Sequence, residues 1–262
     1  MSLFRFFGLA CVLAVLPGCV IVGVNRVGIE EEVYLSQRAT GMLDMTTIVD
    51  GEERPAVLFV PADFDSDRAY PLIVFLHGSG ERGDDGWFQT EFGVGTAIRR
   101  HPERFDCLVF IPQCPSGMGW SWNEGGDGQG ASLPHVTNGI EKIQSNFNID
   151  ADRVSLTGLS MGGFGTFAYG AVEWERFSAF MAVCGGGDPG GAEGLARRPM
   201  RVYHGDADRV VAIERSREMV EAIEAAGGDV KFTVYPGVGH NSWDAAYGIE
   251  EGAVEWLLEQ RR

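Results

Sequence analysis

The amino-acid sequence predicts an α/β protein in which one domain is built on a mostly parallel sheet of about eight strands, with helices on both faces. Two features predict this class. Short apolar runs alternate with segments in which apolar residues recur at helical spacing. The apolar runs are nearly continuous, which is typical of strands buried on both faces. The chain of 262 residues, 45% of them hydrophobic, is long enough for one large core.

Eight apolar segments are predicted to be strands. The first two lie on either side of the turn sequence DGEER, so we expect them to pair antiparallel at the start of the sheet. The predicted strands are residues 42–49, 55–61, 71–77, 107–112, 153–159, 177–184, 200–205 and 230–236.

Four segments between or after these strands show apolar residues at helical spacing, and their alternation with strands predicts parallel pairing. In such a sheet, functional residues collect in the loops beyond the carboxyl ends of the strands. The segment 185–199 is too short for a large lid domain, so we expect an open site. The predicted helices are residues 136–147, 160–172, 212–227 and 249–262.

The N-terminal residues differ from the rest of the chain. An apolar run from Phe6 to Leu16 is too short to span a bilayer and is typical of a signal peptide. It ends in LPGC, which resembles a bacterial lipobox. This resemblance implies cleavage before Cys19 and lipidation of the Cys19 thiol. The alternative is an ordinary signal peptide. We expect an exported protein, periplasmic or at the cell surface, whose membrane contact is this lipid anchor. The predicted parts are a signal peptide (1–18), a tether (19–41) and a catalytic domain (42–262).

The charge and the cysteine content limit the binding partners, disulfides and metal sites that the sequence predicts. A formal net charge of −16 would repel the phosphate backbone, so nucleic acid is not expected as a partner. Beyond the signal region the chain contains Cys107, Cys114 and Cys184, of which only one pair can form a disulfide. Oxidation of Cys107 with Cys114 and buried free thiols are both compatible with the sequence. The sequence has no CxxC motif or Cys/His cluster, so no metal site is predicted.

The sequence TGLSMGGFG places Ser160 between glycine residues, directly after a predicted strand and at the start of a predicted helix. This strand-turn-helix context is the one that a nucleophile elbow requires, whereas the pattern G-x-S-x-G alone is weak in a glycine-rich chain. The flanking glycines allow a sharp turn that presents the hydroxyl above the sheet. We therefore interpret Ser160 as a nucleophile.

A serine nucleophile needs a base, and the base needs an orienting carboxylate. Among the five histidines, His240 follows the last strand by a short loop, so we expect it near Ser160. Two others, His77 and His204, stand in His-Gly pairs at strand ends and are expected to brace loops. We expect His101 and His135 to be surface or capping residues.

The sequence YHGDADRVV leaves the seventh strand and offers two carboxylates, Asp206 and Asp208, either of which could reach an imidazole. With either one, the chain order is Ser, Asp, His, as in the α/β-hydrolases. The sequence resembles the α/β-hydrolases of the esterase, dienelactone hydrolase and prolyl-oligopeptidase-like group. The resemblance covers essentially the whole chain after the signal region. It is carried by residues 70–83, 111–115 (IPQCP), 152–167, 203–211 and 235–247.

The resemblance implies roles for individual residues. It selects Asp208 as the acid of a triad with Ser160 and His240 and leaves Asp206 as a turn residue. It also implies an oxyanion hole made by the backbone N–H groups of Met161 and Ser79, with Gly80 as a substitute for Ser79. The implied reaction is acyl transfer to a serine and hydrolysis of the acyl-enzyme, with no cofactor.

The expected substrate is therefore a small-molecule or polysaccharide-linked carboxylic ester. Two alternatives remain, a peptidase or amidase of prolyl-oligopeptidase-like type and a non-catalytic binding lipoprotein on the same fold. Trp87, Trp120 and Trp122 lie in two long loops, 78–95 and 113–134, where they would either stack on a substrate or pin the loops to the body. The sequence predicts no oligomeric state.

Overall fold

The computed structural model describes residues 39–120 and 132–262, which all belong to one compact unit, Leu35–Arg262. In these two ranges, no helix has the length and apolar character that crossing a membrane requires. Four sequence predictions fall outside the described residues: the signal peptide (1–18), lipidation at Cys19, most of the tether (19–41) and the role of Trp122.

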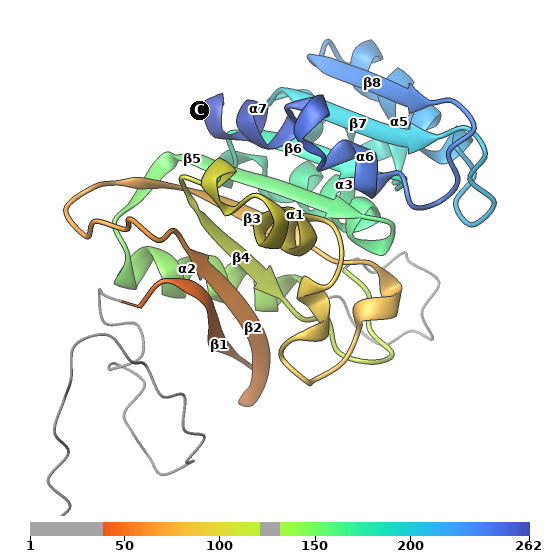
Figure 1. Ribbon diagram of the computed structural model, residues 1–262. Coiled ribbons are helices and arrows are strands. Elements are labelled where there is room, and N and C mark those ends of the chain that lie inside the picture. The colour runs from red at the N-terminus through yellow and green to blue at the C-terminus, as the bar shows by residue number, and fades with distance from the viewer. Residues whose placement is uncertain (1–38, 121–131) are drawn as a thin grey trace, which may run out of the picture. The chain divides into compact units, whose positions relative to one another are not determined.

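Within the described residues, eight strands form one sheet (Figure 1). Their spatial order is β1-β2-β4-β3-β5-β6-β7-β8. β2 pairs antiparallel with β1 and with β4, and the other neighbouring strands are parallel. The predicted α/β class with a mostly parallel sheet is confirmed. The strands are β1 (Gly41–Val49), β2 (Glu52–Val60), β3 (Tyr70–Leu76), β4 (Leu108–Pro112), β5 (Ile149–Leu159), β6 (Ala179–Val183), β7 (Met200–Gly205) and β8 (Val230–Tyr235).

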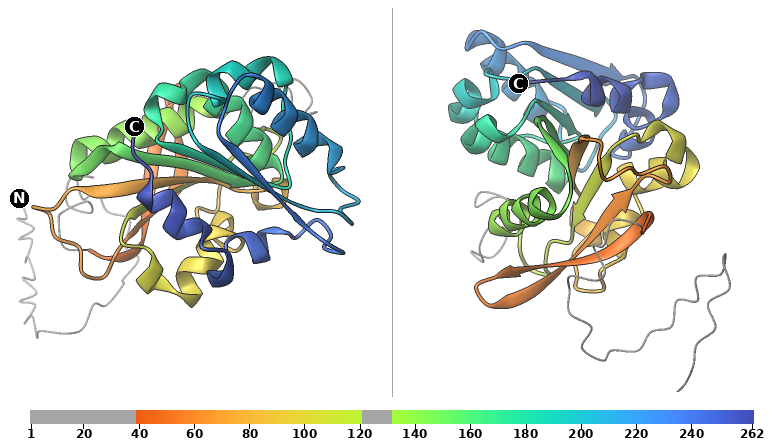
Figure 2. Two further views of the ribbon diagram at one scale, coloured as in Figure 1. Left: turned by 90° about the horizontal axis from the view of Figure 1, so that it is seen from above. Right: turned by 90° about the vertical axis from the view of Figure 1, so that its left-hand side faces the viewer.

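Helices cover both faces of this sheet (Figure 2). Side chains of α2, α3, α4 and α5 join one hydrophobic cluster, and those of α1, α6 and α7 join a second cluster on the opposite face. The helices are α1 (Val94–Arg100), α2 (Leu133–Asn146), α3 (Met161–Glu173), α4 (Ala192–Leu195), α5 (Glu214–Ala225), α6 (Trp243–Ala246) and α7 (Ala253–Glu259).

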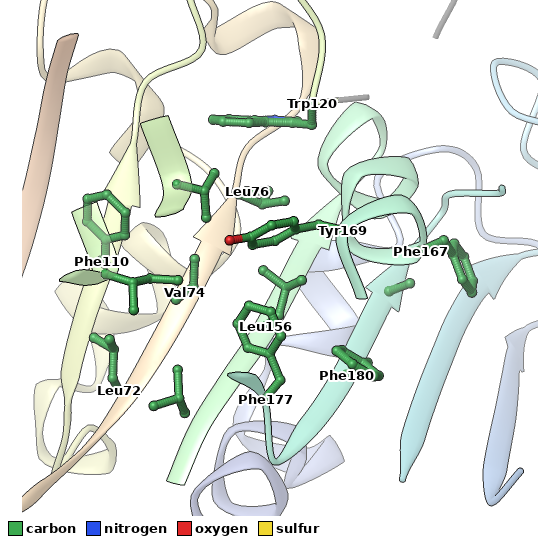
Figure 3. Close-up of a cluster of buried hydrophobic side chains, with 14 of the residues drawn as sticks. Leu72, Val74, Leu76, Phe110, Trp120, Leu156, Phe167, Tyr169, Phe177 and Phe180 are labelled. Atoms are coloured by element: carbon green, nitrogen blue, oxygen red, sulfur yellow. The ribbon is translucent and has the colours of Figure 1, made fainter. Parts of the chain in front are cut away.

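The first cluster holds large aromatic side chains between the sheet and the helices (Figure 3). Leu72 and Val74 of β3 and Leu156 of β5 contribute to it from the sheet, and Tyr169 of α3 contributes from the helix side. Every residue of β3 and β4 is buried, as expected of strands covered on both faces. Burial of such side chains stabilises the fold by about 1.5–3 kcal/mol each.

The structure differs from the sequence prediction at short helices. α1 begins inside the stretch 78–95, which was predicted as a loop, and α4 and α6 have four residues each. Such elements contain too few apolar repeats for a helical spacing to be recognised. The predicted helix 249–262 is divided at Gly252, whose φ of 64° separates a 3₁₀ turn from α7.

Candidate active site

Ser160 occupies the turn between β5 and α3. Its backbone has φ 52° and ψ −119°, a conformation that costs a non-glycine residue energy and is concentrated at functional sites. Two hydrogen bonds hold the turn: the N–H of Ser160 donates to the carbonyl of Val183 at 2.9 Å, and the N–H of Phe164 donates to the carbonyl of Ser160 at 3.1 Å. The serine side chain is therefore fixed where the strand ends.

Glycine residues make this turn sterically feasible. A Cβ atom on Gly162 would lie 1.9 Å from the carbonyl oxygen of Leu76, and one on Gly158 would lie 2.3 Å from the carbonyl oxygen of Gly162. A Cβ on Gly163 would lie 2.7 Å from the carbonyl oxygen of Val183. Because these contacts involve backbone atoms, a larger residue could fit only if strands and helix moved apart.

The structure brings Ser160, His240 and Asp208 together in one chain of hydrogen bonds. The hydroxyl Oγ of Ser160 lies 2.9 Å from Nε2 of His240, and Nδ1 of His240 lies 2.7 Å from Oδ2 of Asp208. The side chain of Asp208 is fully buried, whereas that of His240 is 19% exposed. Asp206 is outside this chain, since its carboxylate accepts from the N–H of Gly237 at 2.6 Å.

The environment of Asp208 favours its ionised form. Burial acts to raise the pKa of Asp208, but hydrogen bonds from His240 and from the N–H groups of Val211 and Val210 outweigh burial and hold the pKa below its ordinary value. A carboxylate only accepts hydrogen bonds, so the proton of neutral His240 lies on Nδ1. Nε2 is then free to accept the proton of the Ser160 hydroxyl.

The predicted oxyanion-hole residues lie on the two segments next to Ser160. Met161 is the first residue of α3, and Ser79 follows Gly78 at the end of β3. A Cβ on Gly78 would lie 3.6 Å from Cβ of Ser160, so this loop lies against the serine. Among the described residues, no acceptor is found for the N–H of Ser79 or of Met161. Their role in binding an oxyanion stays a prediction.

Glu81 is an acidic residue near the site, and its burial was not expected from the sequence. It is 8% exposed, and its Oε2 has no hydrogen-bond partner among the described residues. This atom would lie 2.9 Å from a Cβ on Gly78, on the side of the loop that faces Ser160. Burial raises the pKa of Glu81 above its ordinary value. Its burial depends on how the loop folds, and the neighbouring charged and glycine residues of the sequence indicate a surface position instead.

His77 braces the loop beyond β3, as predicted. The N–H of Cys114 donates to its Nε2 at 2.9 Å, and its Nδ1 lies 2.6 Å from the carbonyl oxygen of Gly78. Since Nε2 accepts, Nδ1 carries the proton and donates. Burial lowers the pKa of His77 to about 4, so the imidazole is neutral at pH 7.

The predictions for the other three histidines have different outcomes. The structure places His101 at the start of a 3₁₀ turn, with a half-exposed side chain beside Glu103, as expected of a surface or capping residue. The same prediction for His135 is wrong: its side chain is buried and bonded to Oγ1 of Thr47 at 2.6 Å. The cause is a contact between α2 and β1, which the local sequence does not reveal. The imidazole of His204 is buried and bonded within the loop after β7, which agrees with the predicted bracing role.

The two described tryptophans of the long loops have different environments. Trp120 is fully buried, and its indole N–H donates to the carbonyl of His77 at 2.9 Å. Its ring lies above Leu76 in the hydrophobic cluster (Figure 3). The structure therefore contradicts substrate stacking for Trp120, and the alternative, pinning of the loop, is correct. Trp87 is 46% exposed and remains a candidate for substrate contact.

A series of aromatic rings leads from His240 to the surface, and the sequence analysis missed it. The ring of Trp243 lies 5.4 Å from that of His240, Phe92 lies 6.4 Å from Trp243, and Phe88 lies 6.4 Å from Phe92, measured between centroids. Phe88 and Phe92 are 43% and 40% exposed. Trp243 also lines a cavity of about 680 Å³ between α1 and residues 243–251. The position of Trp243, three residues after His240, was the available signal.

The three cysteines of the described residues are buried free thiols, so no disulfide joins Cys107 to Cys114. The Cys184 thiol, a carboxylate oxygen of Asp208 and a ring nitrogen of His240 lie within 4.8 Å of one another and could in principle hold a metal ion. However, Asp208 and His240 bind each other, and burial raises the pKa of Cys184 to about 12, so its thiol keeps its proton. That the site uses no metal stays a prediction.

The chain is similar to known hydrolases and esterases. A model of the Dienelactone hydrolase family matches residues 126–249. A solved structure described as a thermostable esterase superposes with a TM-score of 0.77 and 38% identity, covering 84% of this chain and 63% of that chain.

Two curated relatives are more distant. "Probable feruloyl esterase C" of Aspergillus terreus is 25% identical over 189 residues, covering 70% of this chain and 66% of the relative. "Dipeptidyl-peptidase 5" of Porphyromonas gingivalis is 26% identical over 140 residues, covering 52% of this chain. The aligned region spans only 20% of that peptidase.

Proposed function

We propose that this chain, an α/β-hydrolase of the group that includes esterases and dienelactone hydrolases, is a serine esterase that cleaves carboxylic esters with Ser160, His240 and Asp208. One observation carries the proposal. The hydroxyl of Ser160, both nitrogens of His240 and the carboxylate of Asp208 are linked by hydrogen bonds of 2.9 Å and 2.7 Å. This is the order of groups that serine acyl transfer requires.

In the proposed reaction, Oγ of Ser160 attacks the ester carbonyl while Nε2 of His240 takes the hydroxyl proton. The negative charge that develops on the carbonyl oxygen is stabilised by the N–H groups of Met161 and Ser79. His240 then gives its proton to the departing alcohol, and the acyl group remains on Ser160. A water molecule, deprotonated by His240, attacks the acyl-enzyme and releases the acid and the free serine. Asp208 stabilises the imidazolium that forms in each half of the cycle.

The surroundings of the site support small or carbohydrate-linked esters as substrates. Between β6 and β7, the chain forms only a 3₁₀ turn and the four-residue helix α4, which is too little for a lid domain. The exposed rings of Phe88 and Phe92, which are connected to His240 through Trp243, offer apolar surface to an aromatic acyl group or a sugar ring. The similarity to a probable feruloyl esterase is consistent with this class.

Hydrolysis of peptides or amides is the second candidate, and similarity to a dipeptidyl-peptidase favours it. The match covers only a fifth of that relative, which gives it less weight. A panel of acetyl, butyryl and feruloyl esters beside aminoacyl and prolyl amides separates the two functions. We expect ester turnover to dominate, and a preference for amides would contradict the proposal.

The role of Ser160 is tested by Ser160→Ala. We expect turnover of p-nitrophenyl acetate and butyrate to fall by about 10⁶-fold because the nucleophile is lost, while circular dichroism shows an unchanged fold. Ser145→Ala is the matched control, since Ser145 is exposed on α2 and bonds only the carbonyl of Glu141. Full activity in Ser160→Ala would exclude Ser160 as the nucleophile. Absence of turnover of both esters and amides by the unchanged protein would instead favour a non-catalytic binding protein.

We propose that the protein is exported and anchored to a membrane by a lipid on Cys19. The apolar run 6–16 and the LPGC sequence support this proposal. Replacement of Cys19 by serine is then expected to move the protein from the membrane fraction to the soluble fraction, and an unchanged distribution would contradict anchoring.

A further inference from the structure

We propose that His204 is a positioning residue for the active site and acts through Asp208. Its Nε2–H donates to the same carboxylate oxygen that accepts the hydrogen bond of His240, so it holds the carboxylate in place and reduces its basicity. The inference rests on the proposed esterase mechanism, and it assigns a task to an imidazole that the mechanism itself does not use.

The position of the proton on His204 follows from its neighbours. The imidazole stands at the end of β7, and its side chain is fully buried. Its Nε2 lies 3.2 Å from Oδ2 of Asp208 and 3.0 Å from the carbonyl oxygen of Val211. Both neighbours are acceptors, so Nε2 must carry a proton and donate it.

The second ring nitrogen is held by α5. Nδ1 of His204 lies 2.8 Å from Oγ of Ser216, and this hydroxyl lies 2.9 Å from the carbonyl oxygen of Gly185. Burial lowers the pKa of His204, so the ring is neutral at pH 7. With the proton on Nε2, Nδ1 can only accept, so the Ser216 hydroxyl shares its single proton between Nδ1 and the carbonyl oxygen of Gly185. Ser216 thus keeps the ring in the orientation that points Nε2 at Asp208.

Asp208 receives a full set of donors from this arrangement. Its Oδ1 accepts from the N–H groups of Val210 at 2.8 Å and Val211 at 3.0 Å. Its Oδ2 accepts from His240 at 2.7 Å and from the Nε2–H of His204 at 3.2 Å, a proton that it shares with the carbonyl oxygen of Val211. A carboxylate has about four lone-pair sites, so both oxygens are satisfied. Loss of the His204 donor would leave one buried lone pair without a partner.

The donor from His204 has a predictable electrostatic effect. A hydrogen bond to Oδ2 withdraws negative charge from the atom that stabilises the imidazolium of His240. When this donor is removed, the full negative charge on Oδ2 stabilises the imidazolium of His240 more strongly. His240 must be neutral to act as a base, so the acid limb of the kcat/KM profile then moves to higher pH.

The other titratable groups described near His204 do not explain a shift of the acid limb of the kcat/KM profile. Besides Asp208 and His240, the neighbouring strand β6 is followed by Cys184, whose thiol keeps its proton because burial raises its pKa to about 12. On β8, the residue paired with His204 is the apolar Val234. On α5, the guanidinium of Arg215 is half exposed and lies 3.5 Å from the carboxylate of Glu218.

Two substitutions of His204 by amide residues test the proposal, because glutamine and asparagine differ only in side-chain length. In His204→Gln, the side-chain N–H₂ occupies the region of Nε2 and can still donate to Asp208. In His204→Asn, it occupies the region of Nδ1 and reaches only Ser216. For Asn we expect kcat/KM for p-nitrophenyl butyrate to fall about 10- to 100-fold, the magnitude found for hydrogen-bond partners of metal-bound histidines, with the acid limb at higher pH. For Gln we expect both quantities to stay near those of the unchanged protein.

The outcomes are distinct. An equal loss of thermal stability in both variants, with the acid limb at its original pH, would reduce His204 to a structural residue and overturn the proposal. A limb that moves to lower pH in the Asn variant would also overturn it. The esterase mechanism is tested separately, by ester turnover in the unchanged protein and its loss in Ser160→Ala. A failure of that mechanism is therefore recognised before the His204 variants are interpreted.

Discussion

At the scale of single residues, the loop after β7 shows how two identical side chains acquire different tasks. Asp206 and Asp208 are separated by one residue. The carboxylate of Asp208 is fully buried and bonded to His240, whereas that of Asp206 holds an exposed turn through the N–H of Gly237. The difference arises from the backbone of the loop, which directs one carboxylate inward and the other outward.

This difference predicts unequal effects of Asp→Asn substitutions. In Asp208→Asn, an amide can donate to Nδ1 of His240 and favour the wrong tautomer, so we expect kcat to fall by about 10⁴-fold. In Asp206→Asn, the side-chain oxygen can still accept from Gly237, so kcat is expected to stay within about twofold of the unchanged protein. Steady-state kinetics with p-nitrophenyl butyrate compares them. Equal losses in the two variants would contradict the assignment of Asp208.

At the scale of elements, the strand-turn-helix unit around Ser160 depends on close backbone contact. β5, α3 and the end of β3 approach so closely at Gly158 and Gly162 that a side chain at either position would collide with a carbonyl oxygen. Ser160 itself has a strained backbone conformation, with φ 52°. The glycines of the pattern therefore serve the packing of three elements and not only the flexibility of one turn.

Gly162→Ala is expected to destabilise the protein by about 3 kcal/mol or more, since its Cβ would lie 1.9 Å from the carbonyl oxygen of Leu76. Chemical denaturation measures the change. Gly239→Ala is the control, because a Cβ there meets no atom within 4 Å and its φ is not left-handed. Equal stability of the Gly162 variant and the unchanged protein would show that the elements can separate without cost.

Sequence reasoning was effective for these elements because the signals are local. Buried parallel strands are nearly continuous apolar runs, and the turn at Ser160 has its glycines beside it. Contacts between distant segments were missed for the same reason. The packing of Phe92 against Trp243 and of His135 against Thr47 joins residues far apart in the chain, and neither residue of a pair indicates its partner. The burial of Trp120 likewise depends on the carbonyl of His77.

At the scale of the whole molecule, buried neutral histidines couple stability to pH. Burial lowers the pKa of both His77 and His135 to about 4. The unfolded chain, with an ordinary histidine pKa of about 6.5, binds protons below that pH that the folded protein does not bind. The free energy of unfolding is therefore expected to fall as the pH falls from about 6.5 towards 4.

Urea denaturation at several pH values measures this dependence. His135→Gln is expected to reduce the slope between pH 6.5 and 4, because one of the buried imidazoles with a lowered pKa is removed. His101→Gln is the control and should leave the slope unchanged, since His101 is half exposed. A slope that is the same in all three proteins would exclude burial of His135 as its cause.

The central claim is that Ser160 forms the acyl-enzyme, and covalent labelling tests it most directly. A fluorophosphonate reacts with a serine that is activated by a neighbouring base, and mass spectrometry of the digested protein locates the modified residue. We predict one added group, on the peptide that contains Ser160, and its loss in His240→Ala, because the base at 2.9 Å is removed. Ester turnover by a protein whose label lies elsewhere, or whose Ser160 stays unlabelled, would contradict the claim.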